Sequence, residues 1–248
     1  MRFDIVTLFP ELFAPFLTSG VTRRAFESGQ VDVQLSNPRD FAAGNYKRVD
    51  DRPFGGGPGM VMMAEPLSQC LSSLQSQRAD GVPVVLFSPI GKPLNHTMVA
   101  QWAQSQGAIL VCGRYEGVDQ RFIDAHVTDQ ISLGDFVLSG GEIAAMALLD
   151  AVARLQPGVL NTTDSHLQDS FNPELDGLLD CPHYTRPEVW AGGTVPNVLL
   201  SGHHAQIERW RRDQRLQLTV KHRPDLLEVA RKAGRLTKQD EAVLLREG

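Results

Sequence analysis

The sequence predicts an α/β protein with a mainly parallel sheet, followed by a smaller helical section. Short apolar runs of strand length, such as Val84 to Phe87 and Ala108 to Cys112, alternate with longer segments of helical character. This alternation is typical of parallel sheets, because parallel strands need long crossover connections that are usually helices. After about residue 156 the chain becomes polar and then helical only, which indicates a second section.

Prolines and glycines set the limits of several elements. Proline fits the first turn of a helix, so Pro10 opens one, whereas Pro38 ends a strand and Gly29 ends a helix. Residues 39–60 are polar and show no hydrophobic periodicity. The segment is longer than a simple connection between two elements usually is, so we predict a functional loop there. The expected elements are strands over 2–9, 31–37, 83–89, 107–113 and the start of 129–141, and helices over 11–17, 21–29, 67–77, 94–106, 118–127 and 141–155.

Composition and charge exclude several classes of protein. The three cysteines are widely spaced, which argues against a disulfide scaffold and a cysteine zinc site. The longest apolar runs are too short to span a membrane, and the N-terminus has no long apolar segment of a signal peptide, so we expect a cytoplasmic protein.

The net charge of −5 is unevenly distributed along the chain. Residues 1–202 carry 13 Lys and Arg against 22 Asp and Glu, whereas residues 203–248 carry 11 against 7. A basic helical C-terminal section after an acidic N-terminal section indicates an anionic partner. Charged residues on a solvent-exposed helix face would give the same pattern.

Three glycine-containing loops follow expected strands, at residues 88–94, 112–119 and 132–142. The third, "SLGDFVLSGGE", matches neither common phosphate-binding motif, and a glycine-rich segment taken by itself is more often a strand between two turns. In open α/β sheets, however, ligands bind at the carboxyl ends of the strands, and glycine lets the backbone approach a ligand closely. The three loops together therefore predict a binding site for a nucleoside-like ligand, which need not carry a phosphate chain.

Five segments carry a resemblance to a known family: "DDRPFGGGPGM", "LVCGRYEGVDQR", "SLGDFVLSGGE", "LLDCPHYTRP" and "VLLSGHHAQIERWR". In this order they resemble the bacterial tRNA (guanine-N1)-methyltransferases that modify guanosine 37, and they cover nearly the whole chain. The resemblance implies the SPOUT fold with a deep trefoil knot, a homodimer, and S-adenosylmethionine bound by the knot loops. It implies a cofactor domain over residues 1–160 with the knot at about 85–140, a linker over 161–178 and a helical tRNA-binding domain over 179–248.

The family's cofactor-binding residues match this chain on all three loops. The matching positions are Leu86, Ser88, Pro89, Gly113, Tyr115, Glu116, Ser132, Leu133, Gly134, Phe136, Leu138, Gly140 and Gly141, together with Asp180, which the family contributes from the second subunit. The family commonly has tyrosine at the place of Phe136 and proline at the place of Ala144; both changes keep an apolar wall. Without this resemblance, Glu116 would be interpreted as a loop acid that caps the following helix.

Methylation of guanine at N1 requires a general base, because N1 carries a proton, and a cation or donor for the charge that develops on O6. The resemblance assigns these roles to Asp169 and Arg154. Without the resemblance, Arg154 would be interpreted as a positive charge at a helix C-terminus, where the helix dipole favours it. Asp169 would be interpreted as a solvent-exposed acid in a linker.

Substrate contacts are expected on the loop of residues 39–60 and in the basic section. The expected residues are Arg24, Asp50, Gly55, Gly59, His183, Ser201, His203 and Arg209, with Arg23, Arg211, Arg212 and Arg215 as further candidates for binding phosphate. The resemblance also implies a dependence on Mg²⁺, but no carboxylate spacing fixes an ion, so we predict no metal site.

Two other functions remain open at this point. A SPOUT ribose 2′-O-methyltransferase would need neither the "QDSF" acid nor the "DCPHYTRP" segment. A catalytically silent RNA-binding protein would have no reason to keep both Asp169 and Arg154.

Overall fold

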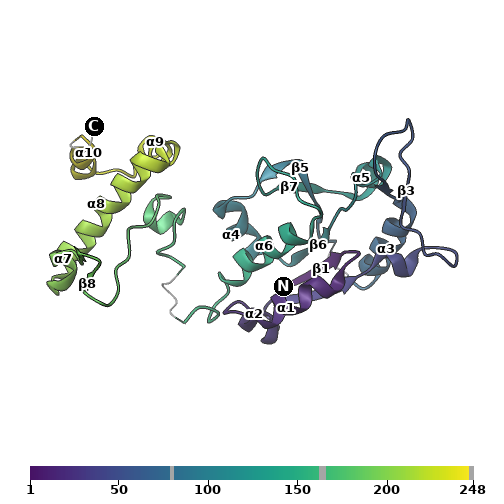
Figure 1. Ribbon diagram of the computed structural model, residues 1–248, viewed down its shortest axis with the longest axis horizontal. Helices are drawn as coiled ribbons and strands as arrows, with labels where there is room; N and C mark the ends of the chain where they lie inside the picture. Colours follow the sequence, from purple (N-terminus) through teal and green to yellow (C-terminus); the bar gives the residue numbers. More distant parts are fainter. Residues whose placement is uncertain (79–80, 162–165, 246–248) are drawn as a thin grey trace. The chain divides into compact units, whose positions relative to one another are not determined.

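The computed structural model describes residues 1–78, 81–161 and 166–245. The chain divides into two compact units, Met1–Asn161 (unit 1) and Thr162–Gly248 (unit 2). Unit 1 contains the sheet, and unit 2 is built mainly from helices (Figure 1).

Unit 1 is built on a five-stranded sheet in the order β2-β1-β6-β5-β7, in which every neighbouring pair is parallel. This arrangement confirms the predicted α/β class and the mainly parallel sheet. The strands are β1 (Arg2–Val6), β2 (Asp32–Ser36), β5 (Val84–Pro93), β6 (Gly107–Val111) and β7 (Asp129–Ser132).

Helices cover both faces of this sheet, and two apolar cores result. The core on one face includes Phe13 of α1 and Leu148 of α6, and the core on the other includes Leu71 of α3 and Phe122 of α5. The helices of unit 1 are η1 (Pro10–Leu12), α1 (Phe13–Thr18), α2 (Arg23–Glu27), η2 (Pro38–Phe41), α3 (Ala64–Ser76), α4 (His96–Ala103), α5 (Gln120–His126) and α6 (Glu142–Ala153).

The central strand β6 shows why the sheet is buried on both faces. Leu110 and Cys112 pack into the first core, whereas Ile109 and Val111 pack into the second, as expected when successive side chains point to opposite faces. All five residues of β6 are buried. A continuous apolar run therefore forms a strand here because both of its faces need apolar partners.

Several boundaries differ from the sequence-based expectation. The long loop of residues 39–60 contains β3 (Asp50–Asp51), which pairs in antiparallel fashion with β4 (Val61–Met62). Helix α3 begins before Pro66 rather than after it, because proline is tolerated in the first helical turn. Strand β5 continues past the expected loop, which forms an irregularity between Phe87 and Lys92 in its pairing with β7.

The described residues of unit 2 include four α-helices, one 3-10 helix, and a small apolar core of Leu178, Leu216, Leu227 and Ala230. A two-residue turn joins the short strands β8 and β9, which the sequence did not predict. The elements are η3 (Pro173–Leu175), β8 (Val189–Trp190), β9 (Gly193–Thr194), α7 (Asn197–Leu200), α8 (His204–His222), α9 (Pro224–Lys232) and α10 (Lys238–Leu244). In the described parts of both units, every helix is too short or too polar to cross a membrane.

Candidate active site

A cavity of about 340 Å³ lies in unit 1 where β5, β6 and β7 end. Its wall is formed mainly by the irregular part of β5 after Phe87 and by the two glycine-containing loops that follow β6 and β7. Thirteen of the fourteen expected cofactor-binding residues line it, all of them except Asp180, which belongs to unit 2. They are Leu86, Ser88, Pro89, Gly113, Tyr115, Glu116, Ser132, Leu133, Gly134, Phe136, Leu138, Gly140 and Gly141.

The second and third loops are joined by backbone contacts. The N–H of Gly141 donates a hydrogen bond to the carbonyl oxygen of Gly113 over 3.0 Å, and Arg114 and Gly140 form an isolated antiparallel bridge. Tyr115, in the second loop, has a φ of +61°, a conformation that costs a non-glycine residue free energy and that clusters at functional sites. The surrounding contacts therefore hold this loop in a conformation that it would not adopt alone.

The third loop turns sharply after β7 and carries exposed apolar side chains in its middle. The hydroxyl of Ser132 and the N–H of Gly134 lie 3.2 Å apart, which closes a local turn. At Gly134 (φ +150°) a Cβ would lie only 2.9 Å from the ring of Phe136, so the turn needs glycine. Phe136 and Val137 remain 55% and 86% exposed, so this rim of the cavity offers apolar surface to a ligand or a partner.

Four polar residues of the cavity wall were not predicted from the sequence: Arg114, Gln120, Gln130 and Ser139. The amide oxygen of Gln130 is buried and has no hydrogen-bond partner in the described part of the chain. A buried acceptor without a partner is costly, so a ligand that donates a hydrogen bond would be favoured here. The available signal was the period of β7, which puts Gln130 on the same strand face as Ser132.

The loop of residues 39–60 packs directly against the second cavity loop. The N–H of Glu116 donates to the carbonyl of Met60 over 3.0 Å, and the N–H of Met62 donates to the carbonyl of Gly117 over 2.9 Å. Gly59 has a φ of +73°, which favours glycine, and a Cβ there would lie 2.3 Å from a carboxylate oxygen of Glu116, so the two residues are in close contact. An expected substrate residue and an expected cofactor residue are therefore neighbours.

The two other expected substrate residues of this loop, Asp50 and Gly55, do not line the cavity. Asp50 pairs with Met62 in the β3–β4 hairpin, and Gly55 lies in an open turn with a φ of +85°. A second, open hollow beside this hairpin is lined by Arg52, Phe54 and Arg121, among others. Exposed cations and an exposed aromatic ring are suited to a nucleic-acid strand.

Arg24 and Arg154 lie at helix ends of unit 1. The guanidinium of Arg24 donates to the side-chain oxygen of Asn161 over 2.7 Å and to the carbonyl of Val159 over 3.2 Å, so it holds the end of the unit. Arg154 is the C-cap of α6, and its N–H donates to the carbonyl of Asp150.

Asp169 lies in unit 2, in a turn fixed by the buried side chain of Asn172. The side-chain amide of Asn172 donates to the carbonyl of His166 over 2.9 Å, and its oxygen accepts from the N–H of Glu174. The N–H of Phe171 donates to the carbonyl of Leu178, a core residue of the unit. Thus the described residues from 166 onward form an ordered turn, while 162–165 of the expected linker lie outside the described residues.

Asp180 lies next to this turn and is held by several partners. Its N–H donates to the hydroxyl of Ser170, and its carboxylate contacts His183 at 2.8 Å and Arg215 at 3.4 Å. Burial raises the pKa of Asp180, but the hydrogen bond from the N–H of Cys181 and the contact with His183 outweigh it, so the pKa is lowered. Asp180 is therefore an anion at neutral pH, suited to a cationic group.

Ser201 and His203 are exposed at the start of α8. The hydroxyl of Ser201 accepts a hydrogen bond from the N–H of His203, which is the N-cap of the helix. Among the described residues there is no group of three or more His, Cys, Asp or Glu side chains placed to hold a metal ion.

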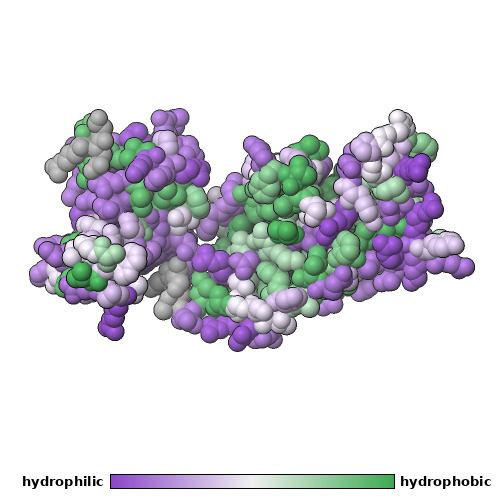
Figure 2. All heavy atoms as spheres, in the orientation of Figure 1, coloured by the Kyte–Doolittle hydropathy of each residue, from purple (hydrophilic) through white to green (hydrophobic). Residues whose placement is uncertain are grey.

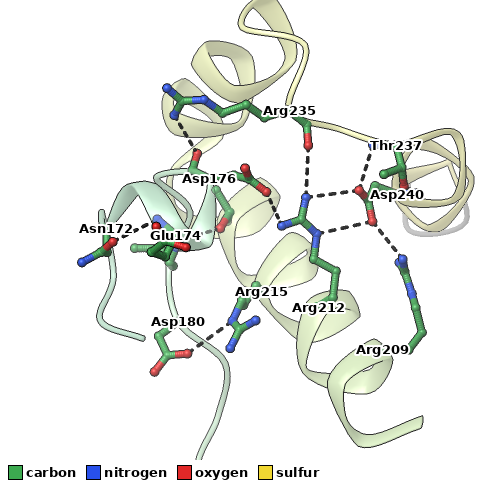
Figure 3. Close-up of polar contacts among 12 residues, drawn as sticks. Asn172, Glu174, Asp176, Asp180, Arg209, Arg212, Arg215, Arg235, Thr237 and Asp240 are labelled. Carbon is green, nitrogen blue, oxygen red and sulfur yellow. Dashed lines mark hydrogen bonds and ion pairs between the residues drawn. The ribbon is translucent and has the colours of Figure 1, made fainter. Parts of the chain in front are cut away.

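The arginines of α8 are paired with acids of unit 2 (Figure 3). Arg209 contacts the carboxylate of Asp240 at 3.0 Å, and Arg212 contacts it at 3.2 Å from the other side. Arg209 also pairs with Asp213, and Arg212 with Asp176. Arg209, expected to bind phosphate, thus helps to hold α10 against α8.

Asp240 is the centre of this network. Its side chain is 1% exposed, and it forms a capping box with Thr237 at the start of α10. Burial acts to raise the pKa of Asp240, but hydrogen bonds from Thr237 and Arg212 lower it to about 2. Because the folded pKa is depressed, the stabilisation is present at neutral pH and is lost as the pH falls below about 4 towards 2.

We predict that Asp240→Asn lowers the free energy of unfolding of unit 2 by about 2 kcal/mol, because two arginines lose a buried charged partner. Urea unfolding followed by tryptophan fluorescence in a Trp102→Phe background measures this in unit 2, where Trp190 and Trp210 lie. The variant should also show a weaker dependence of stability on pH between 4 and 2.

The neighbouring Glu241 provides a matched control. It pairs with Arg231 on the surface, where both side chains are more than a third exposed, so Glu241→Gln should cost less than about 0.5 kcal/mol. Equal effects of the two substitutions would refute the central role of Asp240.

Comparison with known proteins adds to this geometry. The profile of the family described as tRNA (Guanine-1)-methyltransferase TrmD matches residues 1–229. The chain is 80% identical to a tRNA (guanine-N(1)-)-methyltransferase of Albidiferax ferrireducens over 244 residues, which cover 98% of each chain. Proteins of the same name from Paracidovorax citrulli and Leptothrix cholodnii are 71% and 62% identical, and in both comparisons 98% of this chain is covered, with 97% and 98% of the relatives.

Proposed function

We infer, since the chain belongs to the tRNA (guanine-1)-methyltransferase family, that it transfers a methyl group to N1 of a guanosine in tRNA. The observation that carries this conclusion is the match over nearly the whole chain, together with a cavity formed by the family's three loops. We further propose that S-adenosylmethionine is the methyl donor, that the target is guanosine 37 and that the enzyme works in the cytoplasm.

The cavity of unit 1 fits S-adenosylmethionine in size and in chemistry. Its volume of about 340 Å³ lies in the range of small-molecule sites, roughly 300–1,000 Å³. Its apolar wall and backbone groups suit an adenosine, and the buried oxygen of Gln130 needs a hydrogen-bond donor. When bound, S-adenosylmethionine supplies an electrophilic methyl group on a positively charged sulfur.

The side chains of the protein then have two tasks. We propose that Asp169 accepts the N1 proton of guanine as the N1–methyl bond forms and the carbon–sulfur bond breaks, so that the charges balance. Arg154 stabilises the negative charge that develops on O6. Asp180, an anion next to the turn of Asp169, binds the amino group of the methionine moiety in the partner subunit's site, as the family resemblance implies.

A homodimer is part of this proposal. Apolar residues gather on one face of unit 1, over α6 and the ends of β5 and β7 (Figure 2). On these elements and the adjoining loop, Ile90 is 82%, Val137 86% and Ile143 56% exposed. Such side chains on neighbouring elements are typical of a surface that another protein covers.

The trefoil knot and the domain roles are also proposals. After β7 at the edge of the sheet, the chain returns to the end of β6, where Gly141 bonds to Gly113. This return next to an earlier loop supports a knot at about residues 85–140. The basic helices of unit 2 support a tRNA-binding role for the domain over 179–248, joined by a linker over 161–178 to the cofactor domain over 1–160.

Methyl transfer from labelled S-adenosylmethionine to unmodified tRNA transcripts tests the proposal. The transcripts carry guanosine or adenosine at position 37, and nucleoside analysis identifies the product, with and without Mg²⁺. We expect 1-methylguanosine from the guanosine transcript only. A 2′-O-methylated product would favour a ribose methyltransferase, and tight binding of cofactor and tRNA without transfer would favour a silent RNA-binding protein.

A further inference from the structure

An ion pair joins Arg114, which lies in the cavity wall on the second loop, to Glu142, which is buried at the start of α6. The two charged groups are 2.9 Å apart, and their side chains are 18% and 1% exposed. The other carboxylate oxygen of Glu142 accepts a hydrogen bond of 2.8 Å from the hydroxyl of Thr7, just after β1. The guanidinium of Arg114 also lies 4.5 Å from the ring centre of Phe9.

The same ion pair bridges the second and third loops. Arg114 donates from its guanidinium to the carbonyl of Ser139 over 3.3 Å. A Cβ on Gly140 would lie 2.2 Å from Nε of Arg114 and 2.5 Å from a carboxylate oxygen of Glu142. A side chain at position 140 would therefore overlap the ion pair, and glycine avoids this overlap.

We propose that Arg114 and Glu142 are positioning residues that hold the second and third loops at the separation required for cofactor binding. This inference rests on the proposed function, which makes these loops the cofactor site. A buried carboxylate is stable only with a partner, so loss of either member leaves an uncompensated charge that draws in water and loosens the loops. Loops that are ordered before binding lose less entropy on binding, and the affinity rises accordingly.

The substitution Glu142→Gln tests the pair and keeps the shape of the side chain. We expect the dissociation constant of S-adenosylmethionine, measured by calorimetry, to rise about tenfold or more, which is about 1.4 kcal/mol or more. The affinity for tRNA should change less than twofold. We expect the double variant Arg114→Gln/Glu142→Gln to lose less than the sum of the two single losses, since the residues act as a unit.

Asp4 of β1, a second buried carboxylate of unit 1, offers a matched control. It is fully buried near the start of β1 and pairs with Arg2 and Arg78, each at 2.7 Å. Asp4→Asn should lower the thermal stability of unit 1 but leave the cofactor affinity within twofold. Equal losses of affinity in Asp4→Asn and Glu142→Gln would mean that the effect is general destabilisation, and the proposal would be wrong.

Hydrogen exchange separates this inference from the proposed function. In the free protein, Glu142→Gln should accelerate exchange of the Gly141 amide, whose bond to Gly113 joins the loops, whereas Asp4→Asn should not. Unchanged exchange in Glu142→Gln overturns the positioning role. Failure of the wild-type protein to bind S-adenosylmethionine would overturn the proposed cofactor, and the exchange result would still decide whether the pair orders the loops.

Discussion

Replacing Asp169 with asparagine is expected to lower the turnover number for methyl transfer by about 10²–10⁴-fold, the range over which general bases contribute. Asparagine keeps the shape of the side chain but does not accept the proton of N1. The turn that carries Asp169 is held by Asn172 and by the bond between Phe171 and Leu178, so the substitution should leave the turn folded. Single-turnover kinetics with saturating tRNA and cofactor measure the chemical step itself.

The control for this prediction is Glu174→Gln. Glu174 lies five positions further on, is exposed in η3, and carries the same charge in the same segment. Its removal should leave turnover within about twofold, since a solvent-exposed charge is screened. Near-normal turnover of Asp169→Asn would show that Asp169 is not the general base. An equal loss of turnover in Glu174→Gln would show that the effect comes from the negative charge of the segment and not from Asp169 itself.

The sheet of unit 1 could be predicted from local patterns, because each of its buried strands has an apolar sequence. The apolar run of β6 is buried on both faces, and the irregular part of β5 and the loops that follow β6 and β7 meet around one cavity. Parallel strands bring their carboxyl ends to the same edge, so glycines in three successive loops predicted neighbours in space.

Other features depend on contacts between distant residues and have no local signal. Glu142 reads as an ordinary acid in the first turn of a helix, yet its burial depends on Thr7, 135 positions away. Counting charges predicted phosphate binding at Arg209, but the pairing with Asp240 arises only when α10 packs on α8. The segment around Asp169 shows no hydrophobic periodicity. Its turn is stabilised by hydrogen bonds between the side chain of Asn172 and the backbone, which such a pattern does not reveal.

Replacing Gly141 with alanine is expected to weaken S-adenosylmethionine binding at least about 100-fold, a loss of about 2.7 kcal/mol. With a φ of −77°, Gly141 is in a conformation that alanine adopts freely, so strain in its own backbone is not the cause. The added Cβ would lie 2.7 Å from Cα of Cys112 and 3.2 Å from the nitrogen of Gly113. These are backbone atoms at the end of a buried strand, so the third loop must move away from the second.

Gly113→Ala is the matched comparison, since Gly113 faces Gly141 across the hydrogen bond that joins the loops. Its Cβ would meet only the side chains of Val118 at 3.4 Å and Leu86 at 3.7 Å, which are ordinary contacts. Its loss of affinity should therefore be at least tenfold smaller in calorimetry, with circular dichroism showing that the overall helix content is unchanged in both variants. Equal affinities of the two variants would mean that the close approach of the loops does not determine cofactor binding, because the two changes add the same methyl group to the same cavity wall.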